Sequence, residues 1–228
     1  RIFNEWQTAL VHDGGAGSVA QNGKKNPDSV NALDLLTKIY VPYRFDAVAG
    51  INDSYFFRTN DKPAPHNAYI ALKDASEDFP DVWAKDHFSF DEEDFSTSDD
   101  AASELIIDYP TTTPNKVTYE FDPSEGAYNR FINDKAHVDA LDDTQITANN
   151  VIVQYAEHTK VNGYVLVELK YAGDADYFIN GKHISGYWIK DFEDDFTHWF
   201  TDDKEEIVFL PGTTYIQLVP IDFEISWE

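Results

Sequence analysis

The first candidates for chemistry are a histidine and the glycines that follow it. His12 ends the apolar stretch 6–12 (WQTALVH), and Asp13, Gly14 and Gly15 come directly after it. A histidine at the end of a strand, beside a flexible loop, is well placed to act as a general base or to bind a ligand. The alternative is a core histidine that hydrogen-bonds to the backbone. The sequence leaves both interpretations open, with Gly14 and Gly15 as candidate ligand-binding positions.

A second group combines Arg58 with the segment PAPHN, which contains Pro65, His66 and Asn67. Pro65 keeps the preceding residue extended and so fixes the angle at which the next side chains are presented. Arginine can hold a carboxylate or phosphate with two parallel hydrogen bonds, and the chain has only four arginines. Together with His12, these residues form a candidate catalytic set. The alternative is a loop held together by hydrogen bonds.

A third group lies in the segment NRFINDKAHVD, which contains Arg130, His137 and Asp139. If the central Ile-Asn-Asp is a turn, Arg130 and His137 lie on adjacent strands. We expect the three residues to bind a ligand, and again the alternative is a hydrogen-bonded loop.

Several familiar sites are excluded. Gly15-x-Gly17-x-x-Ala20 formally matches a dinucleotide fingerprint, but the following QNGKKNP prevents the helix that must begin inside that motif. No G-x-S-x-G, H-E-x-x-H or S-x-x-K motif occurs, and no two histidines are four residues apart. We therefore expect no cofactor and no sequence-local metal site. Residues 74–108 hold 13 acidic residues and one lysine, but without the spacing of a calcium loop. A solvated linker at about 86–103 is the favoured interpretation, and bound calcium remains the alternative.

The elements that position these groups change along the chain. The spacing of apolar residues over 30–40 predicts a helix that is capped by Asp28 or Ser29 and ends at Pro42. From residue 104 onward, short β-rich runs alternate with turn signals, and Asn180-Gly181 predicts a hairpin. The expected fold class is α+β. A mixed α/β part over 1–100, which includes the acidic linker, precedes a mostly antiparallel β domain over 104–228.

Composition narrows the partners. The formal net charge is −25, from 42 acidic and 17 basic residues, and such a surface repels nucleic acid and anionic lipid. The chain has no cysteine, so neither disulfides nor thiolate chemistry is possible. Methionine is absent even at position 1, which predicts a processed or truncated piece whose signal or anchor lies upstream of Arg1. No apolar run approaches the ~20 residues needed to span a bilayer.

Four segments carry a resemblance to a known family: LVHDGGAG, YFFR with APHNAY, YNRFINDKAHVDALDDTQITANNVIVQYAEH, and DYFINGKHISGYWIKD with PGTTYIQLVP. Together they resemble the YerB-like bacterial lipoproteins, which are built from two consecutive domains of unknown function. The family pattern falls on the candidates already named and also on Trp188 and Lys190. Where the family has a small residue and a serine, this chain has Asp13 and Ala16. The family's first domain begins well before the position of Arg1, so the beginning of that domain is missing here.

The resemblance implies export from a Gram-positive bacterium and a lipid anchor on the extracellular side of the cell membrane, but no known reaction. We expect a binding or scaffolding protein for an envelope ligand or a protein partner. The chain's own missing N-terminal segment is one candidate for that partner. Exposed rings such as Trp188, Tyr187 and Trp199 would stack on sugars. The alternative is a hydrolase or transferase acting on envelope material, with His12 or His66 as general base and Arg58 as anion clamp.

Overall fold

The computed structural model describes residues 5, 9–19, 23–38, 41, 43–64, 66–77, 87–110, 113–140, 142–192 and 195–228. Contacts divide the chain into two compact units. Unit 1 comprises Arg1–Lys85, Thr159–Leu166 and Glu193–Phe196, and unit 2 comprises Asp86–His158, Val167–Phe192 and Thr197–Glu228. The expectations for Pro42 and Pro65 concern residues outside the described ones. Within the described ranges, no helix is both long and apolar enough to cross a membrane.

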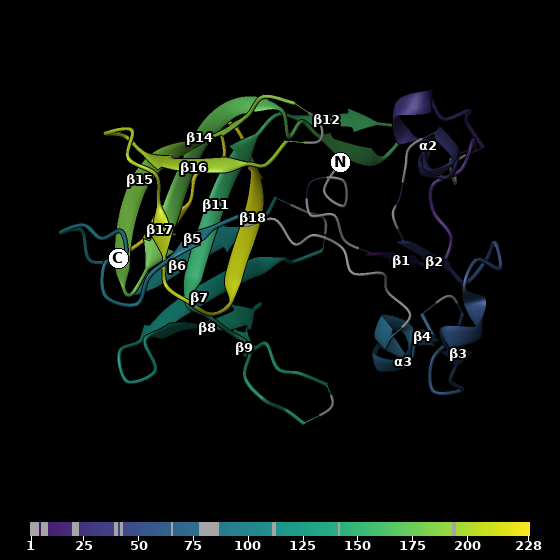
Figure 1. The fold of residues 1–228 in the computed structure, drawn as a ribbon, viewed down its shortest axis with the longest axis horizontal. Helices are drawn as coiled ribbons and strands as arrows, with labels where there is room; N and C mark the ends of the chain where they lie inside the picture. Colours follow the sequence, from purple (N-terminus) through teal and green to yellow (C-terminus); the bar gives the residue numbers. More distant parts are fainter. Residues whose placement is uncertain are drawn as a thin grey trace. The chain divides into compact units, whose positions relative to one another are not determined.

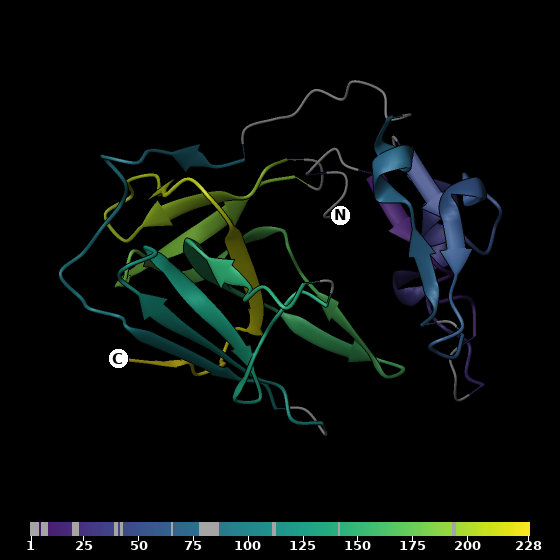
Figure 2. The same cartoon turned by 90° about the horizontal axis from the view of Figure 1, so that it is seen from below.

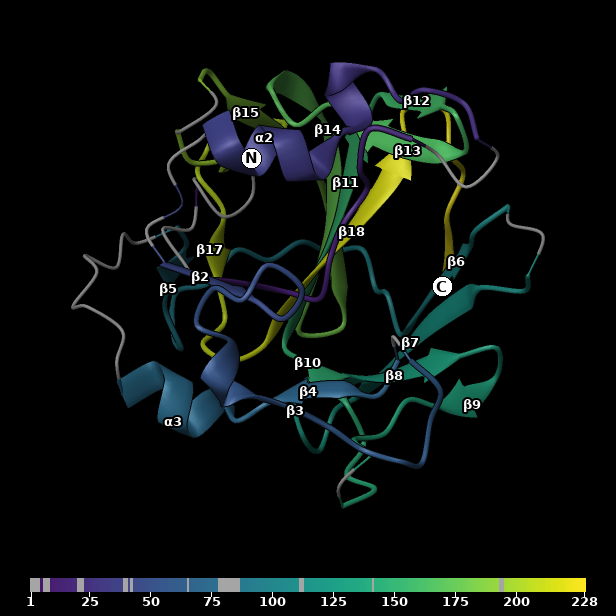
Figure 3. The same cartoon turned by 90° about the vertical axis from the view of Figure 1, so that its right-hand side faces the viewer.

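Unit 1 is built from short elements (Figures 1 and 3). In chain order they are β1 (Ala9–His12), η1 (Asp28–Val30), α2 (Ala32–Lys38), β2 (Tyr43–Asp46), η2 (Asp53–Tyr55), β3 (Phe56–Arg58), β4 (Ala68–Ile70) and α3 (Leu72–Glu77), with most of the hairpin β12 (His158–Val161) and β13 (Tyr164–Val167). Strands β1 and β2 pair in parallel, and β3 pairs with β4 in an antiparallel ladder. The parallel pair brings His12 directly opposite Asp46.

The helix predicted over 30–40 is present but broken. A 3-10 turn over Asp28–Val30 precedes α2, and the break falls at Asn31, whose ψ is 80°. The side chain of Asn31 accepts a hydrogen bond from the backbone N–H of Asp34 at 3.2 Å. The predicted cap at Asp28 or Ser29 is therefore wrong for α2, because Asn31 satisfies an amide of its first turn instead.

Unit 2 contains two larger sheets, which can be followed in Figures 1 and 2. The first sheet has the order β16 (His198–Thr201), β15 (Lys182–Lys190), β14 (Tyr171–Ile179), β11 (Asn150–Ala156) and β18 (Thr214–Pro220). The second has the order β10 (Thr147–Ala148), β8 (Ala127–Ile132), β7 (Lys116–Asp122), β6 (Glu104–Asp108) and β19 (Ser226–Trp227), and β9 (Lys135–Ala136) also pairs with β8. The pairing of β11 with β18 is parallel, while the other pairs in both sheets are antiparallel.

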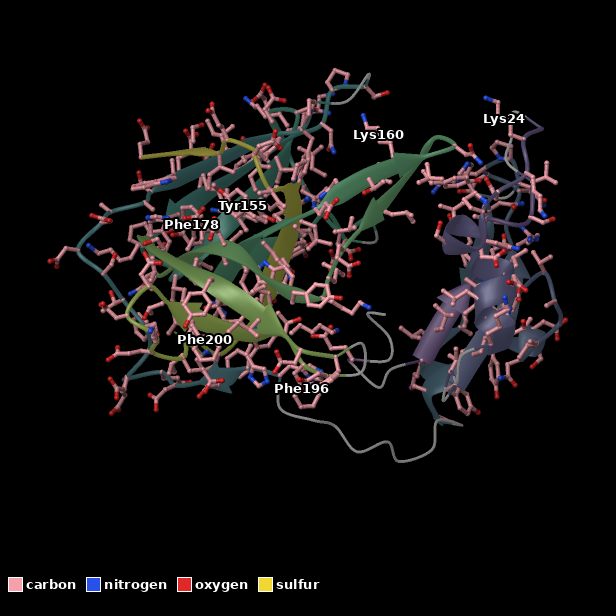
Figure 4. The ribbon with its side chains drawn as sticks, turned by 90° about the horizontal axis from the view of Figure 1, so that it is seen from above. Lys24, Tyr155, Lys160, Phe178, Phe196 and Phe200 are labelled. Atoms are coloured by element: carbon pink, nitrogen blue, oxygen red, sulfur yellow. The ribbon has the colours of Figure 1, made fainter. Side chains whose placement is uncertain are left out.

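The first sheet is buried on both faces. Val151 and Val153 of β11 belong to a core cluster shared with β6, β7 and β8 of the second sheet. Ile152, on the opposite face of the same strand, belongs to another cluster with Trp188 and Trp199. Side chains alternate across a strand, so a strand covered on both faces is apolar throughout. Figure 4 labels Tyr155 of β11 and Phe178 of β14 in this unit.

The segment expected to be a solvated linker is part of unit 2 over its described residues, 87–103. Strand β5 (Ser89–Phe90) pairs in parallel with β17 (Val208–Phe209). Phe88 and Phe95 pack against the cluster that contains Trp188. A count of charges gives no weight to these two phenylalanines among the acidic residues. Burial of their aromatic rings holds the segment against unit 2.

The hairpin prediction at Asn180-Gly181 is confirmed. Ile179 pairs with Lys182, and the two turn residues have φ values of 50° and 72°, as a two-residue hairpin turn requires. In fold class the chain is mainly β with few helices, so the α+β expectation holds only in a coarse sense.

Candidate functional site

The ring of His12 is held on both nitrogens. Its Nδ1 atom lies 2.8 Å from the carbonyl oxygen of Gly14, and its Nε2 atom accepts a hydrogen bond from Nε of Arg44 at 2.9 Å. A carbonyl can only accept and a guanidinium can only donate. In this arrangement Nδ1 of His12 donates and Nε2 accepts, so the ring has no free nitrogen with which to take a proton from a substrate.

Arg44 and Asp46 complete this cluster. Nη2 of Arg44 donates to Asp46 at 2.6 Å, and the other oxygen of this buried carboxylate accepts the backbone N–H groups of Val48 and Ala49. Burial alone would raise the pKa of Asp46, but the hydrogen bonds from Ala49 and Val48, with His12 and Arg44 nearby, lower it overall. The cluster is a closed brace between β1 and β2.

Arg58 brings together two of the predicted groups. Its Nη2 atom donates to both carboxylate oxygens of Asp13, at 3.2 and 3.1 Å, and its Nη1 atom donates to Asn67 at 3.0 Å. Asn67 in turn donates to the carbonyl of Thr59 at 2.9 Å. The sequence therefore correctly placed Arg58 and Asn67 together near the glycine loop. However, Asp13 already neutralises the guanidinium that was expected to clamp an anion.

The remaining unit 1 candidates are not part of this arrangement. His66 is exposed, and among the described residues its ring makes no hydrogen bond or ion pair. Gly14 has a φ of +79°, and a Cβ atom on Gly15 would lie 3.2 Å from Leu33. These two glycines serve a tight turn and close packing against α2, and nothing in their geometry distinguishes a ligand site.

In unit 2, the predicted pair of Arg130 and His137 is brought together. Asn133 and Asp134 form the turn between β8 and β9, with φ values of 51° and 61°. Nη1 of Arg130 then lies 2.6 Å from Nδ1 of His137. Because the guanidinium can only donate, Nδ1 of His137 accepts and its proton is on Nε2. Burial, followed by the nearby charge of Arg130, lowers the pKa of His137.

The guanidinium of Arg130 lies against aromatic rings and a chain of hydrogen bonds. Its carbon is 5.8 Å from the ring centre of Tyr119 and 5.1 Å from that of Tyr215. Its Nε atom donates to the hydroxyl of Tyr119 at 3.1 Å, which also accepts from Gln217 at 2.6 Å. Tyr109 donates to Gln217 at 2.8 Å, and burial raises the pKa of Tyr109 to about 12. Burial also raises the pKa of Tyr119, so the phenol that accepts from the guanidinium is neutral.

Among the residues that the structure describes, Arg130 is a buried charge without a counter-ion. Its side chain is 9% exposed, and no carboxylate of the described residues pairs with it. In the same part of the chain, the only buried side-chain polar atom without a partner is Nδ1 of His183. Nη2 of Arg130 and Nε2 of His137 are therefore unpaired but reachable by solvent. Buried charges in proteins are normally paired. Here the charge of Arg130 and the two donors, one on Arg130 and one on His137, have no acceptor within the described chain.

The other unit 2 candidates lie elsewhere. Asp139 is exposed beyond β9, and its described backbone contacts are with Thr144 and Asp143. Trp188 is 1% exposed and donates from its indole to the carbonyl of Tyr155 at 2.8 Å, and Lys190 is 0% exposed. Trp199 is also a core residue. The expectation that Trp188 and Trp199 expose their rings is therefore wrong, because the second face of their sheet is covered by β5 and β17.

Sequence reasoning missed several polar residues. Arg44 and Asp46 lie in the ordinary strand segment YRFD, and Tyr119 and Gln217 are brought to Arg130 from β7 and β18. His183, which was also missed, lies 2.6 Å from Asp176 through Nε2 and stacks on Trp227 with ring centres 4.2 Å apart. The one sequence signal for these residues is the alternation of side chains between the two faces of each strand.

Comparison with known proteins agrees with this architecture. Residues 106–216 match a family described as the C-terminal domain of a protein of unknown function, DUF3048. The crystal structure of the YerB protein from Bacillus subtilis is similar to the chain with a TM-score of 0.75 and 21% sequence identity, over 99% of this chain and 72% of that one. No curated protein matches the sequence. The resemblance to the YerB-like family is thus confirmed as far as these comparisons reach: residues 106–216 match the DUF3048 C-terminal domain, and the fold of the chain is similar to that of YerB.

Proposed function

We propose that the protein is a binding protein of the cell envelope, and that the Arg130–His137 pair in unit 2 recognises a carboxylate on its ligand. The observation that carries the proposal is the buried guanidinium of Arg130, which has no counter-ion among the described residues. A carboxylate fits the fork of an arginine with two parallel hydrogen bonds. The Nε2–H of His137 supplies a further donor beside it.

A single carboxylate suits this site better than a polyanion does. The chain carries a formal net charge of −25, so a ligand with many phosphates is repelled over the whole surface before it reaches one arginine. A single carboxylate is repelled much less, and it gains a desolvated, charge-assisted hydrogen bond from the guanidinium of Arg130. Peptide ligands with a free carboxyl group, as in the stem peptides of the cell wall, therefore match the site in charge and shape.

The hydrolase and transferase alternative has weaker support in unit 1. A general base needs a nitrogen or oxygen that can reach a substrate proton. His12 uses both ring nitrogens in the brace with Gly14 and Arg44. The ring of His66 is available, but Arg58 is engaged by Asp13 and Asn67, and neither contact involves His66. No nucleophile is associated with these groups in the described chain.

Export and lipid anchoring on the extracellular side of the membrane are part of the same proposal. They are supported by the resemblance to the YerB-like family and fit a chain without cysteine. Metabolic labelling of the full-length precursor with a palmitate analogue in a Gram-positive host, followed by membrane fractionation, tests this. Label in the protein supports the anchor, and unlabelled protein in the cytosolic fraction contradicts it.

The binding role is tested by calorimetry with purified muropeptides that have free carboxyl groups, and with the same muropeptides after chemical amidation. Arg130→Met should weaken binding of the free acids at least tenfold and leave the amides unchanged. The matched control is Lys116→Met, because Lys116 is a cation of the neighbouring strand β7 that pairs with Asp134. Equal binding of acids and amides, or retention on teichoic acid alone, would overturn the proposal.

A further inference from the structure

A pocket opens in unit 2 at one end of strands β11, β14 and β15. Its volume is about 270 Å³. The lining residues are Tyr155, Ala156, Glu157, Glu168, Lys170, Tyr171, Ala172, Gly173, Asp174, Trp188 and Ile221. None of the Arg130 network belongs to this set, so the pocket is a separate site. Its size is at the lower end of small-molecule pockets, which favours one small ring rather than a polymer laid across a groove.

The floor of the pocket is rigid. The indole of Trp188 donates to the carbonyl of Tyr155 at 2.8 Å and lies directly over Gly173. A Cβ atom at position 173 would be 2.6 Å from that carbonyl and 2.7 Å from the indole nitrogen. Only glycine permits this close approach. The packing fixes Trp188 as a floor that does not need to rearrange when a ligand enters.

The wall carries a tyrosine in an unfavourable backbone conformation. Tyr171 has a φ of +77°, which is rare for a bulky residue and costs conformational energy. Its side chain is 68% exposed, so burial of the ring does not compensate for this cost within the chain. Ile221, which also lines the pocket, is exposed as well. An exposed aromatic face beside an exposed aliphatic side chain suits a flat ligand with an apolar face.

The polar groups of the pocket carry both signs. Glu157, Glu168 and Asp174 provide acceptors, while Lys170 provides donors and lies with its ammonium 5.9 Å from the ring centre of Tyr171. Three carboxylates disfavour an anionic ligand. The ammonium of Lys170 already lies near the aromatic ring, where a cationic ligand would otherwise gain most. A neutral ligand rich in hydroxyl groups can use the acceptors and the donors together.

We propose that this pocket binds a neutral sugar residue, with one face of the pyranose ring stacked on Tyr171 and its hydroxyl groups bonded to the carboxylates of Glu157 and Glu168. The inference is independent of the carboxylate site at Arg130. The proposal also explains the strained conformation of Tyr171. The positive φ keeps the ring at the pocket, where it is exposed, instead of packed against the sheet.

The test uses the whole chain labelled with ¹⁵N, titrated separately with methyl β-glucopyranoside, N-acetylglucosamine, glucuronate and tetramethylammonium. The probe is the indole N–H resonance of Trp188, assigned with Trp188→Phe among the five tryptophans of the chain. A saturable shift with either neutral sugar and none with the two ions supports the proposal. Saturation by tetramethylammonium or glucuronate, or no saturable shift with either neutral sugar, overturns it.

Tyr171→Gly separates binding from folding. Glycine adopts a φ of +77° without strain, so the melting temperature should stay unchanged or rise, while sugar affinity falls at least tenfold. The matched control is Phe192→Ala, which removes another exposed ring of unit 2 that is not part of the pocket. Unchanged sugar affinity in Tyr171→Gly, or an equal loss in Phe192→Ala, contradicts the proposed stacking.

Discussion

Nη1 of Arg130 lies 2.6 Å from Nδ1 of His137, although Arg130 is on β8 and His137 follows β9, on the other side of a turn. The contact exists only while His137 is neutral, because a protonated ring has no acceptor to offer the guanidinium. It therefore links the protonation of one side chain to the position of the other.

The first prediction concerns pH. The pKa of His137 is lowered in the folded protein, so the unfolded chain binds the proton more readily. The stabilisation is complete above the unfolded pKa of about 6.5 and is lost as the pH falls towards the folded value. His137→Asn keeps an acceptor near Arg130 but cannot titrate. Urea unfolding between pH 8 and pH 5 should show a shallower loss of unfolding free energy in the variant, and identical slopes would refute this.

The second prediction concerns the stability of the Arg130 site. A buried charge without a counter-ion is costly, and an apolar residue of similar length often replaces such a group at little cost. Arg130→Met should therefore change the free energy of unfolding by no more than about 1 kcal/mol while it abolishes carboxylate binding. Chemical denaturation measures the first effect and calorimetry the second. A loss of several kcal/mol would mean that Arg130 is there for folding and not for a ligand.

The third prediction concerns Asp46 in unit 1. This carboxylate accepts bonds from Arg44, Val48 and Ala49. Asp46→Ala removes the carboxylate partner of the half-buried Arg44, leaves two amides unsatisfied and should destabilise unit 1 by roughly 2–3 kcal/mol. Hydrogen exchange should accelerate at Val48 and Ala49 but not in β11 of unit 2. Asp34→Ala is the control, because the carboxylate of Asp34 pairs with the exposed Lys38 on the surface of α2; equal acceleration in the control would count against the brace.

The fourth prediction tests the packing between β15 and β16. A Cβ atom at Gly186 would collide with the carbonyl oxygen of Phe200 on the paired strand. Backbone cannot move aside as a flexible side chain can, so Gly186→Ala should lower the free energy of unfolding by about 2–4 kcal/mol. Ser185→Ala, at the exposed neighbouring position, should cost about 1 kcal/mol or less. Thermal unfolding of both variants is the measurement, and equal melting temperatures would contradict the strand pairing.

Local signals predicted local structure well. The Asn-Gly pair at 180–181 specifies its own turn, and the turn at 133–134 follows from residues that tolerate positive φ. That turn was enough to predict the contact of Arg130 with His137. Arg58 and Asn67 were grouped because they are nine positions apart, and the hairpin of β3 and β4 brings them into contact.

Long-range features were beyond the sequence. Tyr187 and Trp188 are adjacent in β15 and therefore face opposite sides of the sheet. The sequence cannot show that a second layer covers the face on which Trp188 lies. Trp188 was therefore placed on the surface and Phe88 in a linker. The partners of Arg130 on β7 and β18 are close only through the pairing of distant strands. Tyr171 was missed because its positive φ is set by the fold and not by its residue type.

The most direct test observes the guanidinium of Arg130 itself. The chain has four arginines, so a ¹⁵N spectrum of the side-chain Nε–H groups contains few resonances, and Arg130→Lys assigns the relevant one. Titration with an N-acetylated dipeptide bearing a free carboxyl group should shift that resonance saturably, while the matching dipeptide amide leaves it in place. A resonance that moves with neither peptide, or equally with both, would contradict the carboxylate site.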